Sequence, residues 1–398
     1  MPKLTKETIT RFDYLSKLIA VKDKTDLIKV ITGIRRCGKS TLMGQFRDYL
    51  LDCGVQETHI VEMNFESMGM SGIKNKDGLY RAIADKIQTG TTYLLLDEIQ
   101  HVEDWETAVN SARIDFNVDI YITGSNSKIL SSSLSKDLTG RFFEVHLLPL
   151  SLSEFMLLNG TKDTEKATVD YLERGALPII SADYTDDIVR ELLSGIYNSI
   201  LFKDIMSSNE VRDPVLLENM VEFLLDNIGN TVSPTAISKY VGKDVTIVDR
   251  YLKLITSSYL FYKVKSYDLK GKKLLKTQAK YYCADLGIRN AVIGKQYGDK
   301  GRIMENLVFL ELMRRGYEVR IGKYGDKEID FTARKGSEVL YVQVTLSLES
   351  EYNLEREMAP FYGPKDHYHR MIITGDKTDR TTHNGVEIVG ITDFLSEL

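Results

Sequence analysis

An α/β fold built on a parallel sheet is predicted for the first 150 residues of this chain. Apolar, β-rich runs occur at residues 27–32, 59–65, 92–96, 119–123 and 142–148, with helix-compatible segments at residues 41–51 and 79–88. The run TYLLL is apolar after its first residue and is followed by two carboxylates, which is typical of a parallel strand covered on both faces. From residue 151 the pattern becomes helical and later mixes helices with β-rich runs, so we predict further modules.

The composition limits the class of protein. A chain of 398 residues predicts two or three domains, and 43% hydrophobic with 27% charged residues is typical of a globular protein. A net charge of -5 argues against indiscriminate coating of nucleic acid, but it allows a local basic patch. No apolar run approaches the roughly 20 residues of a membrane span. The three cysteines have neither zinc spacing nor a disulfide pattern, and MPKLTKETITRF lacks a secretory signal, so we expect a cytoplasmic location without a membrane.

The octet GIRRCGKS fits the pattern G-x-x-x-x-G-K-[ST] and lies between a strand-like run and a helix-like run. Glycines let such a loop fold around an anion, and its amides at a helix N-terminus attract phosphate. We therefore predict binding of ATP and Mg²⁺, with Lys39 reaching the β- and γ-phosphates and Ser40 holding the metal. The predicted nucleotide-binding residues are Gly33, Ile34, Arg35, Arg36, Cys37, Gly38, Lys39, Ser40 and Thr41.

Two carboxylates end the buried run at residues 92–96. Ligands gather at the carboxyl ends of parallel strands, which places Asp97 for the Mg²⁺ shell and Glu98 for polarising the attacking water. A strand at residues 59–65 intervenes between the two motifs, as in the branch of phosphate-loop enzymes that uses a glutamate. Together these motifs predict hydrolysis rather than binding alone.

Three further polar residues are candidates for the same site. Asn126 follows the strand at residues 119–123 and either contacts the γ-phosphate or lytic water, or caps the next helix. Arg141 precedes the strand at residues 142–148 and could stabilise γ-phosphate charge in cis, or in trans from another subunit of a homo-oligomer. One of Arg35 and Arg36 is expected to contact phosphate or a neighbouring side chain, and the other to face solvent. Cys37 suggests a thiol that alkylating reagents would reach.

The segments GIRRCGKSTL, LLLDEIQ, ITGSN and LTGRFFEVHLLPLSLSEF resemble the AAA-type P-loop ATPases of bacteria and archaea that carry a C-terminal domain of unassigned function. The resemblance extends from about residue 20 to the C-terminus. It implies a five-stranded parallel sheet with helices on both faces, and an ATP site between subunits or domains. We predict the ATPase domain at residues 1–150 and a helical lid or connector at residues 151–212.

Residues 213–298 have the order helix, helix, hairpin, which resembles a winged helix. Its hairpin is locally basic, so we identify it as a possible contact for DNA phosphates or for a protein partner. The residues of this basic wing are Lys263, Lys265, Lys270, Lys272, Lys273 and Lys276, and Lys280 follows in the same stretch. The second helix is not markedly basic, which argues against sequence-specific DNA recognition.

Residues 299–398 have the order α-β-β-β-α-β, which resembles the restriction-endonuclease core. Asp330 fits the metal-binding carboxylate, Gln343 fits the Glu/Gln of the Glu/Gln-x-Lys triplet, and Glu305 could add a ligand. Thr345 occupies the lysine position and cannot supply a cation. We therefore predict an endonuclease-like fold without nuclease activity.

Three functions remain open from the sequence. The first is an ATPase that couples its nucleotide state to a partner through the C-terminal modules. The second is an ATP-regulated DNA-binding protein or nuclease, whose DNA affinity would fall with salt. The third is a switch that binds another protein through the same modules.

Overall fold

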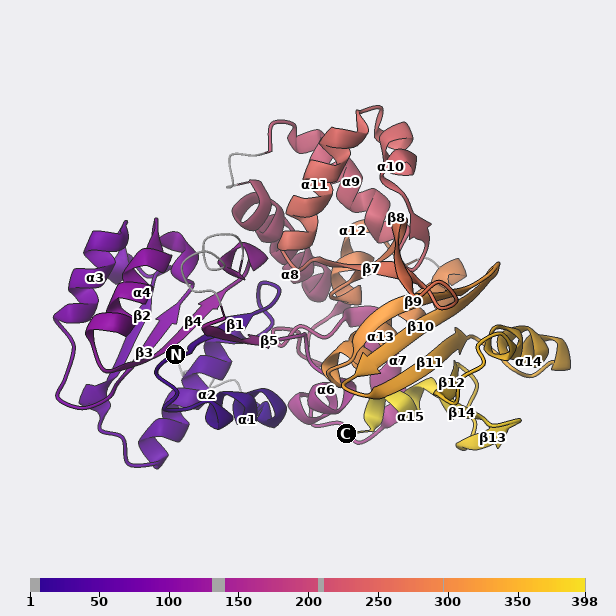
Figure 1. The fold of residues 1–398 in the computed structure, drawn as a ribbon, viewed down its shortest axis with the longest axis horizontal. Coiled ribbons are helices and arrows are strands. Elements are labelled where there is room, and N and C mark those ends of the chain that lie inside the picture. The colour runs from indigo at the N-terminus through magenta and orange to yellow at the C-terminus, as the bar shows by residue number, and fades with distance from the viewer. Residues whose placement is uncertain (1–7, 131–139, 207–210, 296, 398) are drawn as a thin grey trace. The chain divides into compact units, whose positions relative to one another are not determined.

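A computed structural model describes residues 8–130, 140–206, 211–295 and 297–397. The chain forms two compact units (Figure 1). The first extends to Pro149 and includes Ser257–Tyr259, and the second comprises Leu150–Thr256 and the residues from Leu260 onward. Within the described ranges, no helix is long and apolar enough to cross a membrane.

The first unit is built on a five-stranded sheet in the order β2-β3-β4-β1-β5, and every adjacent pair is parallel. Its strands are β1 Ile28–Thr32, β2 Ile60–Asn64, β3 Thr92–Asp97, β4 Val118–Gly124 and β5 Phe142–His146. Every residue of β1, β3 and β4 is buried, as expected for parallel strands covered on both faces. The five-stranded parallel sheet predicted from the sequence is confirmed.

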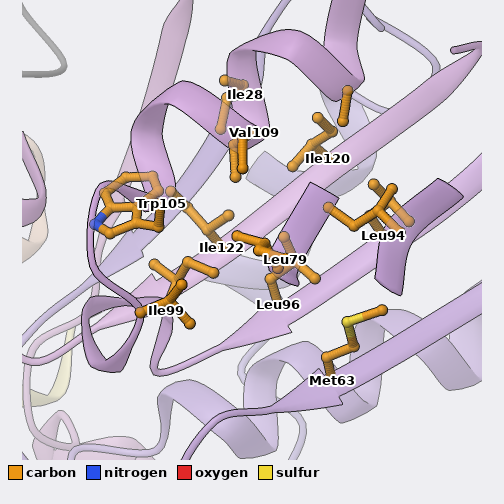
Figure 2. Close-up of a cluster of buried hydrophobic side chains, with 14 of the residues drawn as sticks. Ile28, Met63, Leu79, Leu94, Leu96, Ile99, Trp105, Val109, Ile120 and Ile122 are labelled. Atoms are coloured by element: carbon orange, nitrogen blue, oxygen red, sulfur yellow. The ribbon is translucent and has the colours of Figure 1, made fainter. Parts of the chain in front are cut away.

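Helices cover both faces of this sheet. They are α1 Phe12–Ala20, α2 Lys39–Asp52, α3 Lys76–Ala84 and α4 Trp105–Asp115, with short turns η1 Glu57–His59, η2 Met68–Met70, η3 Ile99–His101 and η4 Ser127–Leu130. On one face, Leu79 of α3 and Val109 of α4 pack against Leu94, Leu96 and Ile122 (Figure 2). On the other, the ring of Phe46 in α2 lies 4.4 Å from the ring of Tyr121. The successive residues Tyr121 and Ile122 of β4 therefore point to opposite faces of the sheet, and each packs against a different helical layer.

A buried ion pair joins β1 to β4. The Lys29 ammonium donates to the Asp119 carboxylate, and both side chains are fully buried. Lys29 also donates to the carbonyl of Lys24 at 2.7 Å, while Asp119 accepts from the amide of Asp23 and the hydroxyl of Tyr121, each at 2.9 Å. These bonds offset part of the cost of burying both charges.

Along the chain, the helices of the second unit come before, between and after its strands. They are α6 Leu152–Leu158, α7 Thr164–Arg174, α8 Asp186–Ser199, α9 Pro214–Asp226, α10 Pro234–Val241, α11 Val245–Ser257, α12 Leu286–Ile293, α13 Lys300–Arg314, α14 Glu351–Met358 and α15 Ile391–Ser396. Short helical segments are η5 Ile200–Ile205, η7 Tyr297–Asp299 and η8 Ala359–Tyr362. Ser233 caps α10 by accepting from the amide of Ala236, and Pro234 occupies its first turn, as the sequence predicts.

One continuous sheet runs through the second unit in the order β13-β14-β12-β11-β10-β9-β7-β8-β6. Its strands are β6 Thr231–Val232, β7 Phe261–Asp268, β8 Lys273–Cys283, β9 Glu318–Tyr324, β10 Lys327–Lys335, β11 Glu338–Thr345, β12 His369–Thr374, β13 Thr381–His383 and β14 Val386–Gly390. Strand β7 pairs with β8 in a hairpin and also pairs in parallel with β9. The hairpin predicted as a wing is therefore continuous with the C-terminal sheet, because its outer edge is occupied by β9.

We expect Asp119→Asn to destabilise the first unit by roughly 3–5 kcal/mol, because Lys29 keeps a buried charge without its counterion. Lys29→Met/Asp119→Asn should cost less than Asp119→Asn alone. The measurement is urea denaturation of the whole chain.

Arg47→Met is the matched control, since Arg47 pairs with Asp48 at the surface, and such pairs contribute about 0–1 kcal/mol. Equal stability of Asp119→Asn and the parent chain would contradict this role of the buried pair.

Candidate functional site

The predicted phosphate loop joins β1 to α2. Gly33 and Gly38 have φ angles of +142° and +104°, which favour glycine, and Arg36 adopts φ +68°. A Cβ on Gly33 would lie 2.2 Å from the carbonyl oxygen of Leu147 and 2.9 Å from the Cys37 sulfur. The chain can make this turn only because Gly33 has no side chain. Lys39 then begins α2 and places the loop at a helix N-terminus.

Lys39 lies inside this loop. Its ammonium donates to the carbonyls of Gly33 and Ile34 at 3.2 and 3.3 Å, and it lies 3.7 Å from Oε1 of Glu98. The side chain is buried, so its charge acts at short range with little screening. Burial, together with the nearby Lys39 charge, lowers the pKa of His146 to about 4. His146 is therefore neutral near pH 7, and Lys39 supplies the positive charge beside it.

Asp97 is held by side chains from three other elements. Its Oδ1 accepts from Ser40 of α2 at 3.1 Å and from Thr123 of β4 at 2.6 Å, and its Oδ2 accepts from the Asn64 amide of β2 at 2.8 Å. Burial raises the pKa of Asp97, and the bonds from Thr123 and Ser40 oppose that rise. The structure thus brings Ser40 and Asp97, the two predicted metal ligands, into direct contact.

Glu98 occupies a constrained position next to Asp97. Its φ of +53° lies in the left-handed region, which is uncommon for a residue with a side chain. Its backbone amide donates to the Thr123 hydroxyl at 2.9 Å, and its carboxylate accepts from the side-chain amide of Gln100. The same Gln100 amide lies 3.4 Å from the Ser125 hydroxyl. Glu98 is therefore held between Lys39 on one side and Gln100 on the other.

Four residues at this site were not selected from the sequence: Arg11, Asn64, Thr123 and Gln100. Asn64 ends β2 and Thr123 is the penultimate residue of β4, and both strands lie beside β3, so the rule that ligands gather at carboxyl ends of parallel strands could have found them. Gln100 lies two residues beyond Glu98. Arg11 had no local signal: its buried guanidinium donates to the carbonyls of Cys37, Leu148 and Pro149 at 3.4, 2.8 and 3.3 Å.

The remaining loop residues differ in exposure. Arg35 is buried and donates to Glu66 at 3.1 Å, whereas Arg36 is exposed. Ile34 is buried in the core, while Ser40 and Thr41 are exposed at the start of α2. The expectation that alkylating reagents would reach Cys37 is wrong, because its side chain is fully buried and burial raises the pKa of its thiol.

Asn126 and Arg141 lie at opposite ends of the parallel strands. Asn126 is at their carboxyl ends, and Arg141 is at their amino ends. Asn126 is buried just beyond the carboxyl end of β4, whose Gly124 pairs with Thr32 before the phosphate loop. Arg141 is exposed, and its carbonyl accepts from the amide of Ile28, at the start of β1. Since β1 has five residues, a strand length of about 16 Å separates that end from the loop. This geometry does not favour a role for Arg141 in cis. Leu138 and Thr139 of the LTGR segment lie outside the described residues.

Comparison with known proteins agrees with this geometry. Residues 25–156 match the family model described as AAA domain. Over 405 residues, the chain is 40% identical to an uncharacterized protein of Haemophilus influenzae, covering 98% of this chain and 100% of that protein.

The chain belongs to the AAA-type P-loop ATPases.

Other similarities of this chain are more distant. Residues 165–298 match a domain of unknown function. An uncharacterized protein of Methanocaldococcus jannaschii is 27% identical over 372 residues, covering 87% of this chain and 80% of the relative. The solved ORC1 protein of Aeropyrum pernix in complex with DNA has a TM-score of 0.35 and 10% identity, covering 73% of this chain and 94% of that chain. A DNA polymerase III gamma subunit-related protein of Thermotoga maritima has a TM-score of 0.27 and 16% identity, covering 61% of this chain and 84% of that chain.

The second unit of the chain brings two of the predicted nuclease-type residues, Glu305 and Asp330, together around an unexpected cation. The ammonium of Lys280, in β8, lies 2.7 Å from Glu305, 2.8 Å from Glu328 and 4.0 Å from Asp330. The hydroxyl of Tyr282 donates to Glu305 at 2.6 Å. Lys280 is buried, so it does not belong to an exposed basic surface, which corrects its placement beside the basic wing.

Gln343 does not point its amide at this cluster of carboxylates. Its Oε1 accepts from the backbone amide of Asp330 at 2.7 Å, and its Nε2 donates to Glu357 at 3.1 Å. Thr345 donates to the carbonyl of Ser347 at 3.5 Å. Within the described parts of the chain, no group of three His, Cys, Asp or Glu residues is placed to hold a metal ion.

The described lysines of the basic wing are exposed. They are Lys263, Lys265, Lys270, Lys272 and Lys273. The ammonium of Lys263 also lies 5.8 Å from the centre of the Tyr281 ring, and partial burial lowers its pKa. The side chain of Lys276 lies outside the described part of the structure.

The pKa of Asp330 predicts a pH dependence of stability. Burial, followed by the negative charge of Glu305, raises this pKa from 3.8 to about 8, while Lys280 opposes the rise. Between those values the folded chain binds more protons at Asp330 than the unfolded chain does. Stability should therefore fall as pH rises through this interval, at up to about 1.4 kcal/mol per pH unit.

Asp330→Asn should reduce this slope because asparagine does not titrate, yet its carbonyl can still accept the Val344 amide bond. The measurement is chemical denaturation between pH 5 and pH 8 for both chains. Parallel curves for the parent and Asp330→Asn would contradict the assignment.

Proposed function

We propose that this protein hydrolyses ATP with Mg²⁺ and couples its nucleotide state to a partner through the second unit. One observation carries the hydrolysis proposal: Ser40 contacts Asp97 at 3.1 Å, while Glu98 lies 3.7 Å from Lys39. A hydroxyl–carboxylate pair for a metal, a cation for phosphate and a carboxylate for water thus occupy one edge of the sheet.

The donor set of the site fits Mg²⁺. This ion prefers hard oxygen ligands, usually one or two carboxylates with waters and phosphate oxygens. Asp97 and Ser40 would hold it, and it would supply charge neutralisation at the phosphates when bound. Asn64 and Thr123 keep the Asp97 carboxylate fixed, so little reorganisation is needed at the moment of binding.

The chain's own groups have distinct roles in this proposal. Lys39 and the amides of residues 33–41 bind phosphate oxygens, which positions the γ-phosphate for in-line attack. Glu98 orients and polarises the water, and Gln100 holds the Glu98 carboxylate in place. Asn126 lies at the same sheet edge and either contacts the γ-phosphate or water or only supports the following turn.

Arg141 fits a role in trans better than one in cis, because it is exposed at the far end of the sheet. This geometry supports a homo-oligomer in which Arg141 approaches the nucleotide of another subunit. The three free cysteines Cys37, Cys53 and Cys283 fit a reducing compartment, so we place the protein in the cytoplasm.

The second unit supplies the output in this proposal. We assign residues 151–212 to a lid or connector, 213–298 to a winged-helix-like module and 299–398 to an endonuclease-like module without nuclease activity. The order α13-β9-β10-β11-α14-β12 supports the last assignment. The position of Lys280 among the carboxylates supports inactivity, because its ammonium already neutralises charge that a catalytic metal would need.

We expect Lys39→Ala to abolish ATP binding, and Glu98→Gln to retain binding while lowering turnover by roughly 10²–10⁴-fold. Loss of Lys39 removes the phosphate-binding charge, whereas the amide in Glu98→Gln keeps the shape but cannot polarise water. Nucleotide binding and phosphate release are measured separately. Lys86→Ala, at an exposed position of the same unit, is the control. Undiminished hydrolysis by Lys39→Ala would refute the proposal.

We expect Gln100→Ala to lower kcat by roughly tenfold with little change in ATP affinity. The reason is loss of the hydrogen bond to the Glu98 carboxylate, and bonds to charged groups contribute about 1.5–3 kcal/mol. Single-turnover kinetics and equilibrium nucleotide binding separate the two effects. Gln88→Ala removes an exposed amide elsewhere in the unit and should leave both values unchanged. An unchanged or increased kcat in Gln100→Ala would show that Gln100 does not position Glu98.

A further inference from the structure

A groove of about 510 Å³ crosses the second unit over the adjacent strands β11, β10, β9 and β7. Four tyrosines line it, and we call it the tyrosine groove: Tyr267, Tyr324, Tyr341 and Tyr368. Its volume lies within the range of about 300–1,000 Å³ that is typical of ligand sites. The groove lies apart from the Lys280 cluster, since neither Lys280 nor its three carboxylate partners line it.

The tyrosines present rings at different depths. Tyr341 is buried at the base, where its hydroxyl donates to Asp366 at 2.9 Å. The ring of Tyr368 lies 5.7 Å from that of Tyr341 in an edge-on contact and is 45% exposed. Tyr324 packs closely over Gly363, where a Cβ would lie 2.4 Å from its ring. The groove therefore has a fixed aromatic base and an accessible aromatic wall.

Positive charge surrounds these rings. Lys272, Arg320, Arg334 and Lys365 line the groove, against two carboxylates, in a chain whose net charge is -5. Glu318 is engaged by Arg320 at 2.5 Å, and Asp366 accepts the Tyr341 hydroxyl. The Arg320 guanidinium also lies 5.2 Å from the centre of the Tyr267 ring. Lys272, Arg334 and Lys365 are exposed, so cations are available to a ligand at the rim.

An apolar ligand would leave the exposed cations Lys272, Arg334 and Lys365 at the rim without complementary charge.

We propose that the tyrosine groove binds single-stranded nucleic acid. Unpaired bases stack on aromatic side chains and on arginine, while lysines and arginines follow the phosphates. Rings inside a groove reach bases only when the bases are unpaired, which disfavours a duplex. An acidic protein would use the same cations, so polyglutamate serves as a competitor that distinguishes an acidic partner from nucleic acid. Lys272 comes from the predicted basic wing, so part of that wing contributes to this groove.

Single-stranded nucleic acid would be the partner to which the proposed ATPase couples its nucleotide state. Only that coupling rests on the proposed function, and binding to the groove does not. Binding is therefore measured with the full chain in EDTA and without ATP, by anisotropy of a fluorescein-labelled deoxythymidine 15-mer. We expect affinity to fall steeply between 50 and 200 mM salt. Failure of ATP hydrolysis leaves this result unchanged, and absence of binding at low salt overturns the groove without affecting the ATPase proposal.

Matched variants locate the site. Tyr368→Ala should weaken binding by roughly 5- to 100-fold, the range expected for loss of one stacked base. Lys365→Ala should weaken binding and make it less dependent on salt, because one phosphate contact is lost. The controls are Tyr352→Ala, at a position that is 75% exposed but does not line the groove, and Lys162→Ala in an exposed loop. Equal weakening by variant and control overturns the proposal.

Competition decides the class of ligand. An unlabelled deoxythymidine 15-mer should displace the probe at far lower concentration than a duplex of equal length, free thymidine monophosphate or polyglutamate. Equal competition by the duplex or by polyglutamate would show that the groove attracts any polyanion through charge alone, and would overturn the proposal. Equal competition by the mononucleotide would identify a nucleotide site instead and would also overturn it.

Discussion

The carboxylate of Asp97 is the point on which the nucleotide site depends. It receives hydrogen bonds from α2, β2 and β4, so one side chain of β3 connects four elements at the edge of the sheet. Burial alone would favour the neutral carboxyl group, as the raised pKa indicates. The donors from Ser40 and Thr123 oppose that effect. The same contacts fix the strand end from which Glu98 projects.

The phosphate loop can pack at this end of the sheet because Gly33 has no side chain. Gly33 allows the loop to approach Leu147 beyond β5, and buried Arg11 joins the loop at Cys37 to the chain at Leu148 and Pro149. Both contacts tie the loop to the segment at residues 147–149. Such preorganisation lowers the cost of ordering the site when nucleotide binds.

One sheet of the second unit combines the lysine-rich hairpin of β7 and β8 with the C-terminal strands. Pairing of β7 with β9 joins the predicted wing to the C-terminal strands. Lys280 from β8 then reaches Glu305, Glu328 and Asp330, and Lys272 reaches the groove that crosses β9 to β11. A lysine-rich hairpin is thus divided between a buried ion cluster and an accessible surface. Neighbouring lysines acquire different roles because their strands face different surroundings.

The sequence by itself determined the parallel sheet and the phosphate loop and selected Ser40 and Asp97 for one site, because motif spacing and buried strand runs are local signals. The direct contact between these two side chains came from the tertiary structure. The sequence also selected Glu98, although not the Gln100 contact that holds it. Tertiary structure alone decided that Cys37 is inaccessible, that Arg141 lies at the far end of the sheet, and that Lys280 rather than residue 345 faces Asp330. These outcomes depend on strand order and burial, which bring together residues that are distant in the chain and leave no periodic signal in it.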